Sequence, residues 1–288
     1  MITFNSRNIS AGLLIAATFS GFATSAQAVE NGVTNWPNGV NTVLPAMMPP
    51  QGATQFYGYT IYYSADKFVD GNGDELIPGF GLDVYAQAFR VNHTWDYKTD
   101  SGVTFTSGAI LSGGKYDLEV SGLDDTESLH LSTGFSGFVP LGDYNANALV
   151  NTTSNYESYV QEFDFTWFPS QEWEISMSPT ITFNAKNDDT NYESGDLFNL
   201  DYFAGYRPST APQWQVGVAG HYTKQFTDDK LNGYKVGDGF RLKKFAVGPQ
   251  VFYAFGPATA VVFKYLHETN VEYGTEGSSL WFQFAMPL

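Results

Sequence analysis

Residues 173–186 alternate without exception between apolar and polar side chains. The apolar set is Trp173, Ile175, Met177, Pro179, Ile181, Phe183 and Ala185. Successive side chains of a β-strand point to opposite faces, whereas a helix repeats every 3.6 residues, so the pattern predicts a strand with one apolar and one polar face. Similar alternation returns over residues 214–223, 245–255 and 280–286. Strands in soluble domains average about five or six residues. These runs reach about ten, which is the length that crosses a bilayer when the strand is tilted.

Two all-β architectures produce long alternating strands. A soluble β-sandwich buries the apolar set in a core, whereas an outer-membrane barrel turns it to lipid and keeps the polar set in a wet lumen. Aromatic residues at the strand ends, where interfacial girdles form, favour the barrel: Trp167, Trp173, Tyr206 and Trp214. The polar set is also rich in Gly, Ser, Thr and Gln, which suits a crowded lumen. We therefore predict a transmembrane antiparallel β-barrel over residues 53–288, with a soluble sandwich as the alternative.

The connections between strands predict the strand count. Those at residues 97–102, 168–171, 207–213 and 256–258 are short, whereas those at 66–79, 141–156, 187–197, 227–239 and 268–277 are long. Short turns of such barrels face the periplasm and long loops face outside. Because each strand must run in the opposite direction to the one before it, a short fourth strand is needed at residues 115–121. The total is then twelve strands, an even number as expected.

The N-terminus has the pattern of a secretory signal. Arg7 precedes an apolar stretch at residues 11–22, and Ala26-Gln27-Ala28 offers the small residues that signal peptidase accepts. The stretch is short for a spanning helix, so an uncleaved anchor is the less favoured alternative. We predict cleavage of residues 1–28 and a mature protein in the outer membrane of a Gram-negative bacterium.

Residues 29–52 do not alternate. Pro37, Pro45, Pro49 and Pro50 prevent a ladder strand over most of this stretch, because proline donates no backbone hydrogen bond. Such an irregular segment either hangs in the periplasm or folds into the lumen as a plug. We expect the plug, since a lumen needs filling or gating.

Composition excludes several functional classes. Because there is no Cys, a disulfide scaffold, a thiolate metal site and a cysteine nucleophile are impossible. The formal net charge of −16 argues against nucleic-acid binding, which needs a basic surface. The four His have no metal-ligand spacing, and no Gly-x-Ser-x-Gly motif occurs. We expect no cofactor and no enzyme activity, with an outer-membrane hydrolase using His221 as an alternative.

One acidic turn has part of a calcium-loop pattern. Asp70, Asn72 and Asp74 have the one-three-five spacing of an EF-hand, but positions six and twelve are Glu75 and Gly81 instead of Gly and Glu. The same composition suits an ordinary surface turn. A metal site here is therefore the weaker interpretation. The acidic loop at residues 187–196 has the same two interpretations, a site for divalent cations or a solvated charge run.

Alternation places a mixed set of side chains on the inward face. The charged and ionisable candidates are Glu162, Asp164, Asp201, Arg207, His221, Lys244, Lys264 and Glu268, with Arg90 in a strand of ambiguous phase. Inward charges tune pore selectivity or brace the barrel wall, and the pattern leaves both interpretations open. Three aromatic residues share the inward parity, Phe138, Phe203 and Trp281. They would form a track for an aromatic solute or plug the barrel.

Short motifs in a fixed order run through nearly the whole mature chain. They include Asn31-Gly32, Asn41-Thr42, Pro78-Gly79-Phe80, Gly142-Asp143-Tyr144, Tyr192-Glu193-Ser194-Gly195-Asp196, Gly248-Pro249-Gln250 and Ser279-Leu280-Trp281. In these the sequence resembles the putative MetA-pathway-of-phenol-degradation family of outer-membrane proteins. The resemblance implies a β-barrel, encoded near operons for aromatic catabolism, that passes hydrophobic molecules.

Together these observations predict a monomeric, porin-like outer-membrane channel for passive uptake of small hydrophobic or aromatic compounds. Its expected partners are the solute and outer-membrane lipid. Two alternatives stay open, an outer-membrane hydrolase and a structural barrel with a closed lumen.

Overall fold

The computed structural model describes residues 34–100, 102–112, 115–125, 128–140, 144–145, 154–256 and 258–288. The predicted signal at residues 1–28 lies outside the described residues. Within the described part of the chain the secondary structure is β throughout, and no helix there is long and apolar enough to cross a membrane.

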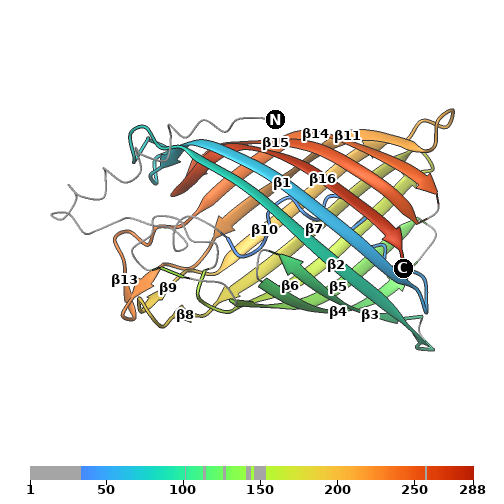
Figure 1. Ribbon diagram of the computed structural model, residues 1–288, viewed down its shortest axis with the longest axis horizontal. Helices are drawn as coiled ribbons and strands as arrows, with labels where there is room; N and C mark the ends of the chain where they lie inside the picture. Colours follow the sequence, from blue (N-terminus) through green and yellow to red (C-terminus); the bar gives the residue numbers. More distant parts are fainter. Residues whose placement is uncertain are drawn as a thin grey trace, which may run out of the picture.

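Twelve antiparallel strands close into a barrel within the described residues (Figure 1). In chain order they are β1 (Thr54–Val69), β2 (Leu82–Lys98), β3 (Thr104–Ser112), β4 (Lys115–Asp125), β5 (Leu129–Pro140), β6 (Ser158–Ser170), β7 (Trp173–Asn184), β10 (Leu197–Tyr206), β11 (Trp214–Gln225), β14 (Lys243–Gly256), β15 (Thr259–Glu272) and β16 (Gly274–Pro287). The first and last strands close the barrel, with Gln55 opposite Pro287 and Val69 opposite Gly274. The predicted fold and strand number are confirmed.

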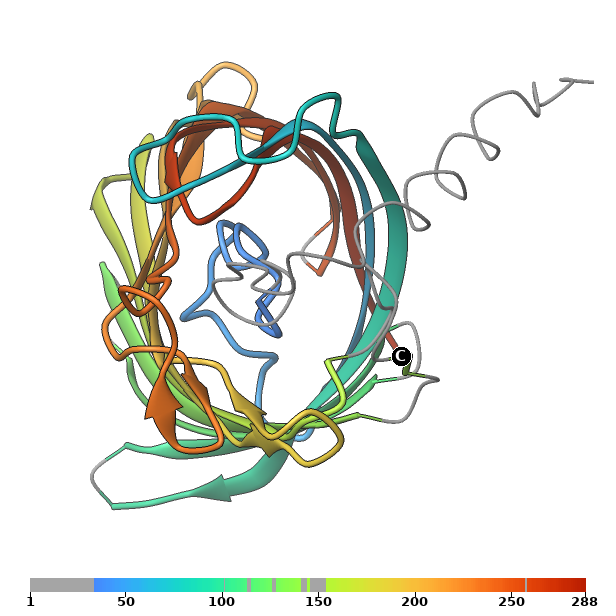
Figure 2. The same ribbon diagram turned by 90° about the vertical axis from the view of Figure 1, so that its left-hand side faces the viewer.

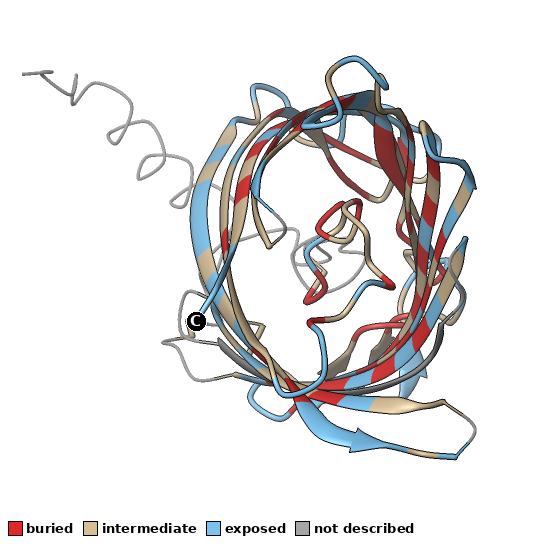
Figure 3. Cartoon of the chain, turned by 90° about the vertical axis from the view of Figure 1, so that its right-hand side faces the viewer, coloured by how far each residue is buried: buried red, intermediate tan, exposed pale blue. Residues whose placement is uncertain are grey.

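The two faces of each strand differ as the alternation predicts. On β7 the side chains of Ser176, Ser178 and Thr180 are buried, whereas Trp173 and Met177 on the opposite face are exposed. The same alternation of buried and exposed positions recurs on β5, β6 and β15 (Figure 3). A soluble protein rarely exposes so continuous an apolar surface. This outer surface is therefore the lipid-facing band of an outer-membrane barrel, with its polar face inside.

Aromatic pairs mark one rim of the barrel. Trp173 and Tyr206 lie opposite each other on β7 and β10 with ring centroids 5.2 Å apart. Trp214 and Tyr253 pair in the same way on β11 and β14 at 4.6 Å. This rim holds short connections such as 171–172, and we assign it to the periplasm.

Several predicted boundaries need correction. The loop predicted at residues 66–79 begins later, because β1 continues to Val69. The loop predicted at residues 268–277 is a tight turn, because β15 continues to Glu272 and β16 begins at Gly274. Polar outward residues such as His267 and Thr269 interrupt the apolar pattern there, but the backbone ladder continues beyond the lipid band. The fourth strand is also longer than predicted, reaching Asp125 instead of residue 121.

Two outer loops join in a small second sheet. It contains β8 (Lys186–Asn187), β9 (Tyr192–Glu193), β12 (Lys230–Leu231) and β13 (Tyr234–Lys235), in the order β13-β12-β9-β8. It extends beyond the end of the barrel opposite the C-terminus (Figure 1). The backbone pairing of β9 with β12 ties the two loops to each other.

Residues 34–53, here called the N-terminal segment, run through the interior of the barrel (Figure 2). They form turns and no strand, in agreement with their prolines. Two hydrogen bonds between residues 52–53 and Thr94 then lead the chain into β1 at the periplasmic rim, from Gly52 N to Thr94 O (2.9 Å) and from Thr94 N to Ala53 O (3.1 Å).

Candidate functional site

The N-terminal segment follows β6 along the length of the lumen. The Asn35 side-chain amide donates to Ser158 Oγ at 2.5 Å near the outer end of β6, and the Asn41 amide donates to Glu162 at its middle. The segment therefore occupies the lumen in depth and descends from the outer half of the barrel to the periplasmic rim.

Two charged wall residues hold the tightest turn of the segment, and we call Asp201 and Lys264 the latch. The Asp201 carboxylate accepts the backbone N–H of Gly39 and of Asn41, each at 2.8 Å. Lys264 Nζ donates to the Gly39 carbonyl and, at 2.6 Å, to Thr42 Oγ1. Both side chains are buried. Hydrogen bonds to charged groups contribute about 1.5–3 kcal/mol each, so the latch is a strong attachment.

The turn itself depends on a glycine. Gly39 has φ +84°, in the left-handed region that favours glycine, and Val40 N closes the turn on the Pro37 carbonyl at 3.0 Å. A Cβ at Gly39 would also lie 2.8 Å from Leu266 Cδ1. The turn therefore fits closely against β15.

Three uncharged wall residues that sequence reasoning missed also hold the segment. Gln250 accepts from Thr42 Oγ1 at 2.7 Å and donates to the Thr42 carbonyl at 3.1 Å. Gln283 donates to the Val40 carbonyl at 3.1 Å, and Ser178 accepts from the Asn41 amide at 3.3 Å. All three lie at inward positions of the alternating pattern, so the sequence could have indicated that they face the lumen. Their partners could not be foreseen because the segment has no periodicity that fixes its position.

Apolar contacts complete the attachment. Trp36 and Val40 belong to one buried cluster with inward side chains of the wall, namely Phe138, Val160, Phe203, Ala219, Ala246, Leu266 and Trp281. The Trp36 ring meets Phe138 edge to face, with centroids 6.2 Å apart. Gly205 and Gly217 leave room for the Phe203 ring, since a Cβ on either would lie within 2.7 Å of it.

A separate charged network lies nearer the outer end of the lumen. Lys244 Nζ lies 3.2 Å from Glu268 Oε1 and 3.0 Å from Thr275 Oγ1, and Tyr63 donates its hydroxyl to Glu268 at 2.6 Å. Lys244 and Glu268 are both buried. These contacts join β1, β14, β15 and β16, so the pair braces the wall where the barrel closes.

The structure places ten of the eleven predicted lining residues on the inward face with buried side chains: Phe138, Glu162, Asp164, Asp201, Phe203, His221, Lys244, Lys264, Glu268 and Trp281. Arg207 lies in the periplasmic turn after β10, where it donates to the Pro212 carbonyl at 2.9 Å. Glu162, Asp201 and Lys264 contact the N-terminal segment, and Phe138, Phe203 and Trp281 share its apolar cluster. A role in solute contact stays a prediction for all eleven.

A small cavity lies between the segment and the wall formed by β1, β2, β3 and β5. Its volume is about 30 Å³, and its lining includes the aromatic Trp36, Tyr59 and Phe138 and the polar Asn41, Arg90 and Ser136. That volume holds about two water molecules. This cavity is too small for an aromatic solute.

The inward face brings Ser, Asp and His into register without forming a catalytic triad. Asp201 lies opposite Ser178 on one side and His221 on the other, so the carboxylate separates the serine from the histidine. Among the described residues, Ser178 bonds to Glu162 and Asn41, and His221 Nδ1 has no partner. A triad needs the histidine between the other two groups. This arrangement therefore lacks the proton path of a serine hydrolase.

The turn at Asp70 is built by its own backbone. Asp70 Oδ1 accepts the N–H of Asn72 at 2.8 Å and of Asp74 at 3.0 Å, and these bonds lower the pKa of the Asp70 carboxyl. In the described part of the chain no three His, Cys, Asp or Glu side chains are grouped to hold a metal ion. A metal site at Asp70, Asn72 and Asp74 remains a prediction.

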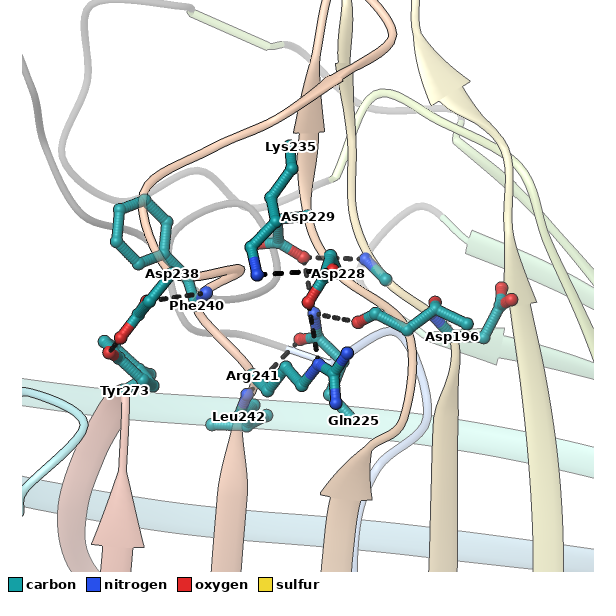
Figure 4. A network of polar contacts seen from close by, with 12 residues as sticks. Asp196, Gln225, Asp228, Asp229, Lys235, Asp238, Phe240, Arg241, Leu242 and Tyr273 are labelled. Atoms are coloured by element: carbon teal, nitrogen blue, oxygen red, sulfur yellow. Dashed lines mark hydrogen bonds and ion pairs between the residues drawn. The ribbon is translucent and has the colours of Figure 1, made fainter.

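Buried and paired carboxylates hold the outer loops together (Figure 4). Asp229 accepts from Gly195 N at 2.7 Å and from Gln225 Nε2 at 2.6 Å, which links the loops after β7 and β11. Asp228 pairs with Arg241 at 2.8 Å. Tyr273, in the turn between β15 and β16, donates its hydroxyl to Asp238.

The contact between Tyr273 and Asp238 predicts an alkaline transition. Burial, together with the neighbouring Asp238 carboxylate, raises the pKa of Tyr273 to about 12. The contact is therefore complete below pH 10 and is lost as the pH rises through about 12, when two negative charges would face each other. The tyrosinate absorbance of the protein minus that of Tyr273→Phe is expected to titrate near pH 12. A midpoint near pH 10 would contradict the contact with Asp238.

Comparison with solved structures places this barrel among outer-membrane proteins. The COG4313 outer membrane channel from Pseudomonas putida F1 superposes with a TM-score of 0.72 at 15% identity, over 84% of this chain and 97% of that chain. The KdgM porin and the NanC porin align with TM-scores of 0.45 each, at 8% and 10% identity, over 80% and 81% of this chain and 97% and 98% of theirs. The first likeness shows that this chain has the fold of an outer-membrane channel.

No curated protein sequence matches the chain. A family model does match it, over residues 65–128 and 120–284, which together span most of the barrel. The chain therefore belongs to the family described as Putative MetA-pathway of phenol degradation.

Proposed function

We propose that the protein is a gated outer-membrane channel whose N-terminal segment closes the lumen at rest. Small hydrophobic or aromatic compounds would pass by diffusion when the segment moves. The observation that carries the proposal is the latch, because Asp201 and Lys264 bind the backbone of the segment inside the barrel.

The chemistry of the lumen supports an apolar solute. Phe138, Phe203 and Trp281 present aromatic side chains to an interior whose inward residues are mostly polar. A few apolar contacts within a polar passage slow a hydrophobic solute without trapping it, which suits passive movement. Membership of a family named for phenol degradation agrees with this class of solute. The protein would need no cofactor and no enzyme activity for this role.

Deleting residues 34–50 tests the gate. In planar bilayers the deletion variant is expected to conduct continuously, whereas the full chain conducts rarely, because the polar wall would then be lined by water. A synthetic peptide of residues 34–50 added to the variant is expected to lower its conductance again, and a scrambled peptide serves as the control. If deletion leaves conductance unchanged, the segment is not the gate, and a barrel with a closed lumen becomes the better account.

A further inference from the structure

Trp36 is the largest side chain that the N-terminal segment contributes to the apolar cluster it shares with the wall, and its ring packs on Phe138. Its side chain is 7% exposed and lies at one end of the apolar cluster. We call five wall residues of this cluster the aromatic seat, namely Phe138, Val160, Phe203 and Trp281 with the partly buried Tyr59. These residues come from β1, β5, β6, β10 and β16, so the barrel wall itself supplies the seat.

The indole is held in this cluster by shape and apolar contact. Its buried Nε1 has no hydrogen-bond partner among the described residues, although a buried donor normally has one. The ring packs edge to face on Phe138 at a centroid distance of 6.2 Å. The seat therefore accommodates a planar fused ring and provides no hydrogen-bond acceptor for its N–H.

The rest of the segment is attached independently of the indole. The latch, Gln250 and Gln283 hold residues 39–42 through polar contacts on β10, β14, β15 and β16. Shortening the Trp36 side chain would therefore leave the turn in place and enlarge the space beside it. Tyr59 and Phe138 line that space, together with the polar Asn41, Arg90 and Ser136. An aromatic ring can pack on the tyrosine and phenylalanine rings of such a space and can also lie against the arginine guanidinium.

We propose that the aromatic seat is a binding site for planar aromatic hydrocarbons of one or two fused rings, and that Trp36 occupies it at rest in place of the solute. Entry of a solute then competes with Trp36 for the seat. The proposal rests on the proposed function only for how a solute reaches the lumen. The seat and its selectivity are properties of the closed barrel.

Equilibrium dialysis of labelled naphthalene against the detergent-solubilised full chain tests the seat. Trp36→Ala is expected to bind naphthalene saturably at one site per barrel, and Trp36→Leu, which fills part of the space, more weakly. The matched control is Trp173→Ala, which also removes one indole but from the exposed periplasmic rim. It is expected to show only the unsaturable partitioning of the unmodified protein. Migration of unheated samples on gels verifies that each barrel is folded.

Selectivity gives a second readout. In Trp36→Ala, naphthalene is expected to bind at least about fivefold more tightly than indole, because the seat leaves a donor unsatisfied. The seat is overturned if neither Trp36 variant binds saturably, or if Trp173→Ala binds equally well. Tighter binding of indole overturns the stated selectivity.

These outcomes are separable from those of the gating experiment. Saturable binding together with an unchanged conductance in the deletion variant would support the seat and refute the gated channel. A conducting deletion variant without saturable binding in Trp36→Ala would support the gated channel and refute the seat.

Discussion

Asp201→Asn is expected to raise the fraction of time that the channel conducts by at least about tenfold. The carboxylate accepts the backbone N–H groups of Gly39 and Asn41, and it also accepts from Asn199 at 2.9 Å. An amide of the same shape has one acceptor oxygen, so one buried N–H of the segment would face an NH2 group. One charge-assisted bond is lost with its N–H left unsatisfied, and the other becomes a weaker neutral bond. Together these changes weaken the attachment by about 3 kcal/mol, which is about a hundredfold change in the ratio of bound to released segment.

The matched control for this prediction is Asp164→Asn. Asp164 is also a buried inward carboxylate, but its hydrogen bond goes to Ser132 on the neighbouring strand and not to the segment. Both substitutions remove one lumen charge, so an effect of charge alone would appear in both variants. Single-channel recordings showing the same open fraction in the two variants would refute the role given to Asp201.

Glu268→Leu is expected to lower the free energy of unfolding of the barrel by about 3–5 kcal/mol. The substitution removes the partner of Lys244, whose ammonium lies 3.2 Å from the Glu268 carboxylate and is buried. A buried charge without its counter-ion is far costlier than the pair. It also leaves the Tyr63 hydroxyl without one of its two partners. Urea titration of the protein in lipid vesicles measures the loss.

The double variant Lys244→Met with Glu268→Leu separates charge from packing. Because it leaves no unpaired charge, it is expected to be more stable than Glu268→Leu alone. Lys67 and Glu276 offer an exposed comparison, since their side chains form an ion pair at 3.5 Å on the outer face. Removing that pair is expected to change stability by less than about 1 kcal/mol. A double variant no more stable than the single variant would show that the pair is not the source of the loss.

The barrel could be predicted from the sequence because period-two alternation is a local property. Trp173, Ile175 and Met177 alternate with Glu174, Ser176 and Ser178, so one apolar and one polar face follow from backbone geometry alone. The same parity was sufficient to place Asp201 and Lys264 in the lumen. It could not extend β15 to Glu272, because the outer ends of strands leave the lipid and lose the apolar pattern.

What the inward residues contact was decided only by the tertiary structure. Gly39, Asn41 and Thr42 are distant from Asp201, Lys264 and Gln250 in the sequence, and nothing periodic in the N-terminal segment records how far it enters the barrel. Its position follows from the closure of β1 on β16, which encloses the segment among polar groups that need partners. Sequence alternation thus determined which face each side chain occupies, and three-dimensional closure determined that the inner face holds the segment.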